Sequence, residues 1–404
     1  MAVKIHTKID TGMGRIGFQC VNEELDMVKA GIVLYAKVAE VIYKGDEKMI
    51  ALVFCGDLKY CPYINRYIER LENAHLDYKV YFWNRSKFNI NLSDHYVYYD
   101  QASELTSGKI QKLFDFVKFR RWLIRQLKNN HHEKIIVLST LTGVFLGDFL
   151  YKEKKGSYIF DIRDYSYEHI KPFFAIEKKV IENSAFTAIS SKGFKEFLPE
   201  HDYIIAHNFN RKDIIDGAKF KKAKGKINFV WNGVVRYFEF QRDYLDALKN
   251  DPRFNIIFHG DGPELKLYKN YCTKNSFMNV LFMGSYNNAD KSVLLENAHI
   301  LNNCYGNKKY DGSKVKYAVS NRFYDGMIYH IPQLVEPDGY KPRWAKQVGI
   351  GESFAVDSDF ADRLYNYYIN IDAEEFDIAC NNVMKDVLCE DDEYIMKIDS
   401  FILC

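Results

Sequence analysis

Short apolar runs alternate with stretches of helical periodicity from residue 49 onward. The runs are rich in Val, Ile and Phe and end in polar turns, which is typical of strands covered on both faces in parallel sheets. The expected strands form two series, at 49–55, 78–83, 135–139, 158–162, 187–190 and 203–206, then at 227–231, 255–259, 280–283, 299–302, 331–335 and 354–356. Helices are expected at 63–74, 109–128, 169–183, 241–250, 263–275 and 358–369.

Two such series predict an α/β protein with two doubly wound, Rossmann-like domains that face a cleft. A chain of 404 residues is long enough for two cores. The lysine-rich stretch 210–226 has little periodicity and is interpreted as a solvated linker. The predicted domains are therefore 49–209 on the acceptor side and 227–385 on the donor side, with 386–404 as a C-terminal helix packing back toward the N-terminal domain.

Composition narrows the class of protein. The formal net charge of +2 is too small for the overall positive charge that is typical of nucleic-acid-binding proteins. Any anion site must therefore be formed by a local group of residues. The eight cysteines have no metal-ligand spacing and several lie in apolar runs, which indicates buried thiols in a reducing compartment. No signal peptide and no membrane-spanning run is visible, and we expect a cytoplasmic protein, including one peripheral on the inner face of the membrane.

The segment 320–335 reads as a helix start, a short helix, a turn and a buried strand. Ser320 or Asn321 can cap the helix, so that free N–H groups and the positive end of the dipole favour a phosphate. Arg322 adds a fixed charge, and Asp325 can accept hydrogen bonds from ribose hydroxyls. The segment predicts a nucleotide site; the alternative is an ordinary capped helix.

A second turn, at 259–264, follows an apolar strand and opens a helix. Gly260 and Gly262 let the backbone approach a ligand, and Pro263 suits a first helical turn. Phosphate binding and a tight strand-to-helix turn explain it equally well.

Four motifs occur in a fixed order: Phe229-Val230-Trp231-Asn232-Gly233, Gly260-Asp261-Gly262-Pro263-Glu264, Asn279-Val280-Leu281-Phe282-Met283-Gly284 and Asn321-Arg322-Phe323-Tyr324-Asp325. With them, residues 227–350 resemble the donor-binding domain of family 4 glycosyltransferases of the GT-B fold. Residues 160–168, 190–193 and 207–208 are similar to capsular-polysaccharide members, and the resemblance extends from about 49 to 357.

The resemblance implies a donor site formed by Gly233, Gly260, Gly262, Gly284, Ser285, Tyr286, Asn321, Arg322 and Asp325. It also places Arg236 where a basic residue stabilises the departing phosphate without a metal. The chain departs from the family at two positions, because Tyr317 and Asp325 stand where two glutamates are usual.

On the acceptor side, Gly56 and Lys59 follow the first strand, and Arg163 and Glu168 follow another. Asp161 and Asp164 are candidates for a catalytic base or for orienting an acceptor hydroxyl. The alternative is an Arg163–carboxylate network that holds a loop.

The expected helix 109–128 carries two apolar stripes. One stripe, at Ile110, Leu113, Phe114, Val117 and Ile124, suffices for packing on a sheet. The second, Phe116, Phe119 and Leu123 with Trp122, lies among Arg120, Arg121 and other basic residues and predicts a membrane-surface contact. Burial of both stripes within the domain is the alternative.

Residues 1–48 resemble joined fragments of alanine racemase, including the Asp10–Arg15 motif. The lysine segment that holds pyridoxal phosphate in that family is missing, so we expect an appended, non-functional fragment and no pyridoxal phosphate.

The expected function is a glycosyltransferase, of the hexosyl- or N-acetylhexosaminyl-transferase class, that uses a UDP- or GDP-linked sugar and no cofactor. The resemblance implies metal-independent, retaining transfer to a glycan or polyprenyl-diphosphate-linked acceptor in bacterial capsular or exopolysaccharide synthesis. A sugar-nucleotide epimerase of the same fold and a non-catalytic glycan-assembly scaffold are the alternatives, and no nucleic acid partner is expected.

Overall fold

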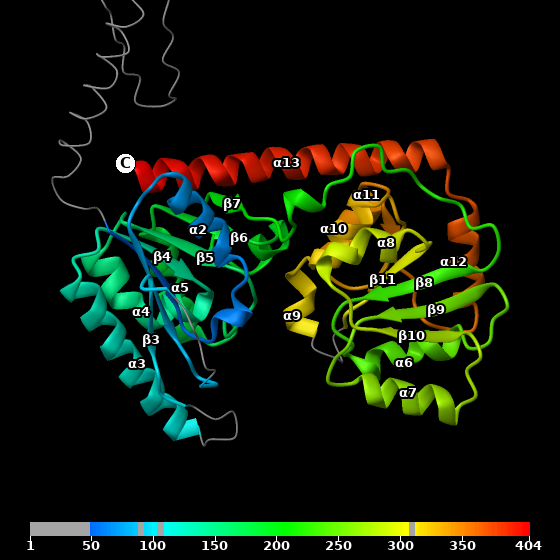
Figure 1. Cartoon of the computed structure of the whole chain (residues 1–404), viewed down its shortest axis with the longest axis horizontal. Coiled ribbons are helices and arrows are strands. Elements are labelled where there is room, and N and C mark those ends of the chain that lie inside the picture. Colours follow the sequence, from blue (N-terminus) through cyan, green and yellow to red (C-terminus); the bar gives the residue numbers. More distant parts are fainter. Residues whose placement is uncertain (1–48, 88–92, 103–108, 307–311) are drawn as a thin grey trace, which may run out of the picture. The chain divides into compact units, whose positions relative to one another are not determined.

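The computed structural model describes residues 49–87, 93–102, 109–306 and 312–404. The racemase-like fragment predicted at 1–48 lies outside these residues. The described chain contains two parallel α/β sheets, as the sequence predicts (Figure 1).

The first sheet has seven parallel strands in the order β3-β2-β1-β4-β5-β6-β7. Its strands are β1 (Ile50–Phe54), β2 (Tyr78–Trp83), β3 (Tyr96–Tyr99), β4 (Lys134–Leu138), β5 (Tyr158–Ile162), β6 (Phe186–Ile189) and β7 (Tyr203–Ile205). A separate apolar cluster covers each face, which is why the strand sequences are almost continuously hydrophobic.

The second sheet has six parallel strands in the order β10-β9-β8-β11-β12-β13. These are β8 (Ile227–Asn232), β9 (Phe254–His259), β10 (Val280–Gly284), β11 (Ile300–Asn303), β12 (Gln333–Val335) and β13 (Gly351–Glu352). The strand order reverses between β8 and β11, and loops at the carboxyl ends of strands beside such a switch point form ligand sites in doubly wound sheets.

α-Helices follow most of the strands in both sheets. In the first part of the chain they are α2 (Ile64–Asn73), α3 (Lys109–Asn129), α4 (Thr140–Glu153) and α5 (Lys171–Glu182). In the second they are α6 (Phe238–Ala247), α7 (Leu265–Lys274), α8 (Lys291–Leu295), α9 (Gly312–Tyr317), α10 (Asn321–Ile328), α11 (Tyr340–Gln347) and α12 (Phe360–Ile369). Figure 1 shows α6 and α7 on one side of the second sheet and α8 and α10 on the other.

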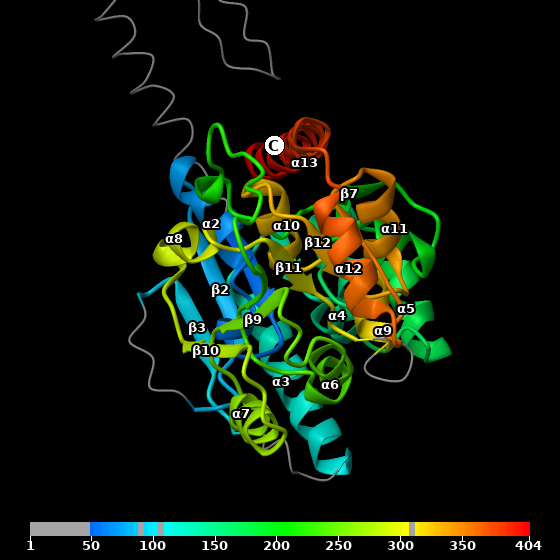
Figure 2. The same cartoon turned by 90° about the vertical axis from the view of Figure 1, so that its right-hand side faces the viewer.

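The last helix, α13 (Ala373–Leu403), contributes to the cores of both sheets. Phe376, Cys380 and Val383 pack in the core of the second sheet, and Ile398 and Phe401 pack in a core of the first. Figure 2 shows α13 near α10, which it contacts. The domain boundary predicted at 385/386 therefore falls inside one continuous helix.

Eleven of the twelve predicted strands overlap an observed strand, and the twelfth is wrong. Residues 354–356 follow β13 as irregular chain, and the paired residues are Gly351 and Glu352. The edge strand β3 and the helices α4, α8, α9 and α11 are additional, and the C-terminal helix predicted at 386–404 begins earlier, at Ala373.

The membrane-surface prediction for α3 is wrong for its aromatic stripe. Phe119 is 2% exposed and stacks on Trp83 of β2, with 5.1 Å between ring centroids. Phe116 stacks on Phe145 of α4 at 4.6 Å, and Trp122 packs against the same core. The stripe interpreted as membrane-facing therefore attaches α3 to the sheet.

The remaining residues of α3 divide between the two sides of the helix. Arg120 forms an ion pair with Asp148 of α4, and Arg121 is exposed. Phe114, assigned to the core-facing stripe, is 60% exposed, while the side chains of residues 110 and 113 lie outside the described ones. Within the described chain, no helix combines the length and the hydropathy that a membrane crossing needs.

The packing of α13 on the first sheet predicts a specific loss of stability. Ile398 is 1% exposed, so Ile398→Ala should lower the free energy of unfolding by about 2–4 kcal/mol through lost contacts and a residual cavity. Met396→Ala, two residues away at a side chain 57% exposed, is the control and should change it by less than about 0.5 kcal/mol. Urea denaturation of both variants measures the difference, and equal effects would contradict the packing.

Candidate functional site

Glycines join the loops at the carboxyl ends of β8, β9 and β10. The Gly233 N–H donates to the His259 carbonyl (2.8 Å), and the Gly260 N–H donates to the Gly284 carbonyl (2.7 Å). Gly260 has φ +142°, and a Cβ there would lie 1.9 Å from the Gly233 oxygen. The three loops are thus held together by backbone contacts that leave no room for a side chain at Gly260.

The turn after β9 is tied to the loop after β8. A Cβ on Gly262 would lie 2.4 Å from the Val235 carbonyl oxygen, and the Val235 N–H donates to the Asp261 carbonyl (2.9 Å). The Glu264 carboxylate accepts from the Phe238 N–H at the start of α6 (2.7 Å). These contacts account for the Gly260–Glu264 sequence as a tight turn.

Arg322 lies at the start of α10, beneath these loops. Its guanidinium carbon is 3.8 Å from the centroid of the Trp231 ring, and its Nη1 donates to the Asn302 carbonyl (2.9 Å). A Cβ on Gly233 would lie 3.2 Å from its Nη2, so the glycine keeps that nitrogen uncovered. The side chain is 6% exposed, and its Nε has no hydrogen-bond partner among the described residues.

No carboxylate lies within ion-pair distance of Arg322 in the described chain, although Asp325 is close enough for its charge to raise the pKa of the guanidinium. Across the described residues, neither Arg322 nor Arg236 forms an ion pair with a carboxylate. Burial lowers the pKa of the Arg322 guanidinium, and the positive charge of Arg236 acts in the same direction. Two like charges near one another, one of them buried, favour a bound anion.

The N-terminus of α10 is not capped by a side chain. Ser320 is the N-cap residue, but its hydroxyl makes no capping hydrogen bond and its Oγ is buried without a partner within the described chain. The expected cap by Ser320 is therefore wrong, and Asn321 is exposed. The free N–H groups and the dipole at this end add to the positive potential around Arg322.

Asp325 already has protein partners on both oxygens. Its Oδ1 lies 2.9 Å from Nζ of Lys291 on α8, and its Oδ2 accepts from the Asn232 amide (3.0 Å). Burial raises the pKa of this carboxyl, and the Lys291 charge opposes the rise. Each carboxylate oxygen has a second lone pair, so a ribose contact at Asp325 stays a prediction.

Tyr286 and Ser285 follow β10. Tyr286 is half-buried, and its pKa is raised by burial and by the negative charge of Asp325, which places its phenol near that carboxylate. Ser285 is exposed. Both stay predicted donor contacts.

Four neighbours of this site were not predicted: Trp231, Asn232, Lys291 and Tyr305. Trp231 and Asn232 immediately precede Gly233, and their position at a strand end is a usable signal. Lys291 and Tyr305 meet the site only through the fold, because no local pattern distinguishes them.

The carboxylate of Asp161 is structural, which corrects its assignment as a catalytic base. Its two oxygens accept from Nε (2.6 Å) and Nη2 (2.8 Å) of Arg163, and Oδ2 also accepts from the Tyr67 hydroxyl (2.8 Å). Asp161 is 0% exposed, so no substrate can reach it. Arg163 donates further to the Ala206 carbonyl (2.7 Å), which makes it a structural residue and not an acceptor contact. The alternative, a network that holds a loop, is the observed arrangement.

The other acceptor-side candidates lie at the carboxyl ends of strands. Gly56 is buried two residues after the end of β1, and Lys59, three residues further on, is exposed. Asp164 is exposed after β5, and the Asp57 carboxylate beside Gly56 accepts from Ser86. Asp164, Gly56 and Lys59 stay predictions.

Solved structures that superpose on this chain include glycosyltransferases. A lipopolysaccharide outer core galactosyltransferase, WaaB, superposes with a TM-score of 0.57 at 17% identity over 88% of this chain and 99% of that chain. Sucrose-phosphate synthase from Thermosynechococcus elongatus gives 0.62 at 14% identity over 86% and 96%. HepE of Anabaena, solved in complex with UDP, gives 0.58 at 12% identity over 87% and 100%.

The chain has the GT-B fold. No protein-family model and no curated protein matches it by sequence. Superpositions at such low sequence identity establish the architecture alone. The activity has to be argued from the residues of this chain.

Tyr317, at the position of the first expected glutamate, packs on residues of the first GT-B domain. Its ring centroid is 4.7 Å from Phe197 and 5.8 Å from Tyr165. Its carbonyl oxygen would lie 2.6 Å from a Cβ on Gly193. The residue therefore forms an aromatic contact between the two halves of the fold in place of an acid.

Near this aromatic contact are two buried carboxyls with few partners. Glu177 of α5 is 0% exposed, and neither of its oxygens has a hydrogen-bond partner among the described residues. Glu168 accepts from the Ser166 N–H (2.6 Å) with one oxygen, and the other has no such partner. Burial, followed by the charge of Glu168, raises the pKa of Glu177 to about 9, and burial also raises the pKa of Glu168. Glu177 is accordingly protonated at neutral pH.

This protonated acid predicts a pH-dependent stability. The folded-state pKa of Glu177 lies above its ordinary value of 4.5. The stability that the neutral Glu177 carboxyl contributes to the fold is therefore fully present below pH 4.5 and is lost as the pH rises toward 9. In that window it lowers the free energy of unfolding by up to about 1.4 kcal/mol per pH unit. Glu177→Gln keeps the neutral shape and should gain stability over the wild type between pH 6 and 9.

Thermal melts at several pH values test this expectation. Glu182→Gln, on the same helix at an exposed position, is the control and should show a difference from wild type that does not change with pH. A constant difference for Glu177→Gln would mean that the carboxyl is already ionised in the folded protein.

Proposed function

We propose that this protein is a glycosyltransferase that moves a sugar from a UDP- or GDP-linked donor to a glycan or lipid-linked glycan. The observation that carries the proposal is the buried guanidinium of Arg322, which has no ion-pair partner in the described chain and lies next to the glycine loops of the second sheet. A diphosphate supplies the missing negative charge. The solved GT-B structures described with UDP support a nucleotide as its source.

In this proposal the diphosphate lies between Arg322, Arg236 and the uncapped start of α10. As the bond to the sugar breaks, negative charge grows on the departing phosphate. Fixed positive groups stabilise that charge without proton transfer and without a metal ion. The nucleoside extends toward Tyr286 and Asp325, with the ribose hydroxyls donating to the carboxylate.

The acceptor lies on the side of the first sheet, against the loops that contain Gly56, Lys59 and Asp164. Asp164 and Glu168 are the remaining acidic candidates on that side, because Asp161 is committed to Arg163. A retaining hexosyl- or N-acetylhexosaminyl-transferase of family 4, acting in bacterial capsular or exopolysaccharide synthesis at the inner face of the membrane, is the most specific form of the proposal. The ordered donor-domain motifs support it.

Removal of the buried charge should weaken every ligand that carries a diphosphate. Arg322→Met keeps the length of the side chain and loses the charge-assisted hydrogen bonds, so UDP and pyrophosphate should both bind about 10- to 100-fold more weakly. Calorimetric titration measures both. Arg242→Met, on α6 with its only ion pair in the described chain to Glu239, is the control and should bind as the wild type does. Unchanged affinity of Arg322→Met, or a wild type that binds neither UDP nor GDP, would sink the proposal.

The ribose assignment is tested separately from the diphosphate. Asp325→Ala should weaken UDP by about 1–3 kcal/mol, since a hydrogen bond to a charged group is lost. Pyrophosphate has no ribose, and Lys291 keeps its partner Asp213, so pyrophosphate should bind as well as before or more tightly. Equal losses for UDP and pyrophosphate would show that Asp325 acts on the fold of the site.

A further inference from the structure

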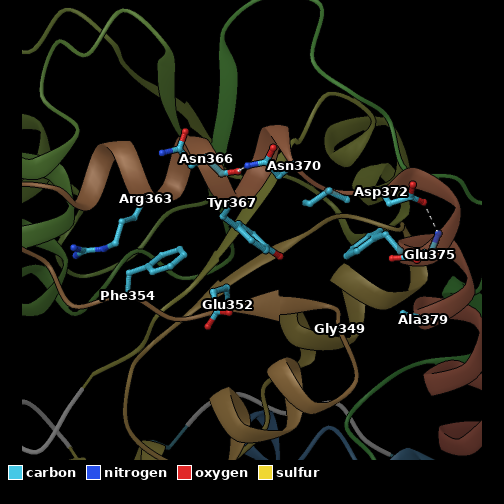
Figure 3. Close-up of a pocket in the computed structure, with 12 residues that line it drawn as sticks. Gly349, Glu352, Phe354, Arg363, Asn366, Tyr367, Asn370, Asp372, Glu375 and Ala379 are labelled. Carbon is cyan, nitrogen blue, oxygen red and sulfur yellow. Dashed lines mark hydrogen bonds between the residues drawn. The ribbon is translucent and has the colours of Figure 1, made fainter.

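A cavity lined by none of the predicted donor-site residues lies beside β13 and α12. Its volume is about 600 Å³, within the range of roughly 300–1,000 Å³ that is usual for small-ligand sites. It is bounded by β13 and the chain after it, by α12 and by the first turn of α13 (Figure 3). None of its lining residues belongs to the nucleotide site, so the proposed function leaves the cavity unexplained.

One face of α12 supplies much of the lining. Arg363, Asn366, Tyr367 and Asn370 recur at helical spacing and all line the cavity. Every one of them has a planar polar or aromatic head. Asn366 and Asn370 are exposed at the rim, and the Tyr367 ring extends from α12 toward β13 (Figure 3).

Several of these groups are free to bind a ligand. Among the described residues, no hydrogen bond engages the Tyr367 hydroxyl or the side-chain amide of Asn366. Arg363 is fixed by its hydrogen bonds to the Ala355 carbonyl and the Asp357 carboxylate, both 2.7 Å. One end of the cavity is therefore rigid, and the middle offers unused donors and acceptors.

An aromatic surface adjoins these polar groups. The ring of Tyr367 meets Phe354 edge to face, with 6.1 Å between centroids. Glu352 of β13 lies close enough to Tyr367 for its charge to raise the pKa of the phenol, in addition to burial. Aromatic rings beside planar amide and carboxylate groups match a pyranose, which presents an apolar C–H face and an edge of hydroxyls.

The charge of the lining selects among ligands. It contains three carboxylates, Glu352, Asp372 and Glu375, against the single guanidinium of Arg363. A nucleotide or another phosphate would be repelled by this excess of negative charge. A neutral, polyhydroxylated ligand uses the same groups as hydrogen-bond acceptors without an electrostatic penalty.

We propose that this cavity is a second carbohydrate site, which binds a neutral glycan segment independently of the nucleotide site. The ligand class follows from the lining alone, and the proposed function adds a consequence. A glycan held here is kept at high effective concentration near the enzyme between successive additions.

The experiment uses the full chain and three probes: maltotetraose, cellotetraose and N-acetylchitotetraose. Binding is measured by saturation-transfer NMR and calorimetry, with and without saturating UDP. At least one probe should bind with an affinity that UDP leaves unchanged. Tyr367→Phe and Asn366→Ala should each weaken that probe about five- to tenfold, because each removes a hydrogen-bonding group. Tyr365→Phe removes a phenol from the same helix outside the cavity and should have no effect.

Four outcomes separate this proposal from its alternatives. Failure of all three probes to bind would overturn it, as would binding that ignores Tyr367→Phe and Asn366→Ala. A probe displaced by UDP would belong to the nucleotide site and would overturn it as well. Probe binding without any UDP binding would support the second site while contradicting the proposed function.

Discussion

The buried ion pair between Asp161 and Arg163 is the contact on which the arrangement of the described chain depends. It joins β5 to α2 through Tyr67, to the end of β7 through the Ala206 carbonyl, and to α13 through Tyr394. A buried ion pair is tolerated only when the remaining polar atoms have partners, and here the two acid oxygens share four donors. The elements that frame the first sheet converge on this pair.

Arg322 is a guanidinium in the opposite situation. Arg163 and Arg322 are equally buried, at 6% exposure each, yet in the described residues only Arg163 forms an ion pair with a carboxylate. The protein places Arg322 on the face of Trp231, which compensates the lost hydration only in part. Arg163 has its charge partner within the protein, whereas Arg322 has none in the described chain, which is the basis for proposing an anion there.

This contrast explains which parts of the site the sequence predicts. Strand-end glycines and a basic helix start are local patterns, so Gly233, Gly260 and Arg322 could be singled out without coordinates, and their role in donor binding stays a prediction. Asp161 and Arg163 stand two residues apart after a buried strand, a pattern that fits a catalytic acid and a structural pair equally. Only partners distant in sequence, Tyr67 and Tyr394, decide between them. For the same reason hydrophobic periodicity located eleven strands, while α13 was divided at 385/386 because its two halves belong to different cores.

The path of α13 has a consequence for folding during synthesis on the ribosome. The apolar core beneath α2 contains Ile50 and Leu52 from β1, and it also contains Ile398 and Phe401 from the last helix. During synthesis the first sheet must wait for residues made some 350 positions later before this core can close. The second sheet can complete its own packing with the first half of α13 while the rest is still emerging. The domain that is translated first is thus the one that folds to completion last.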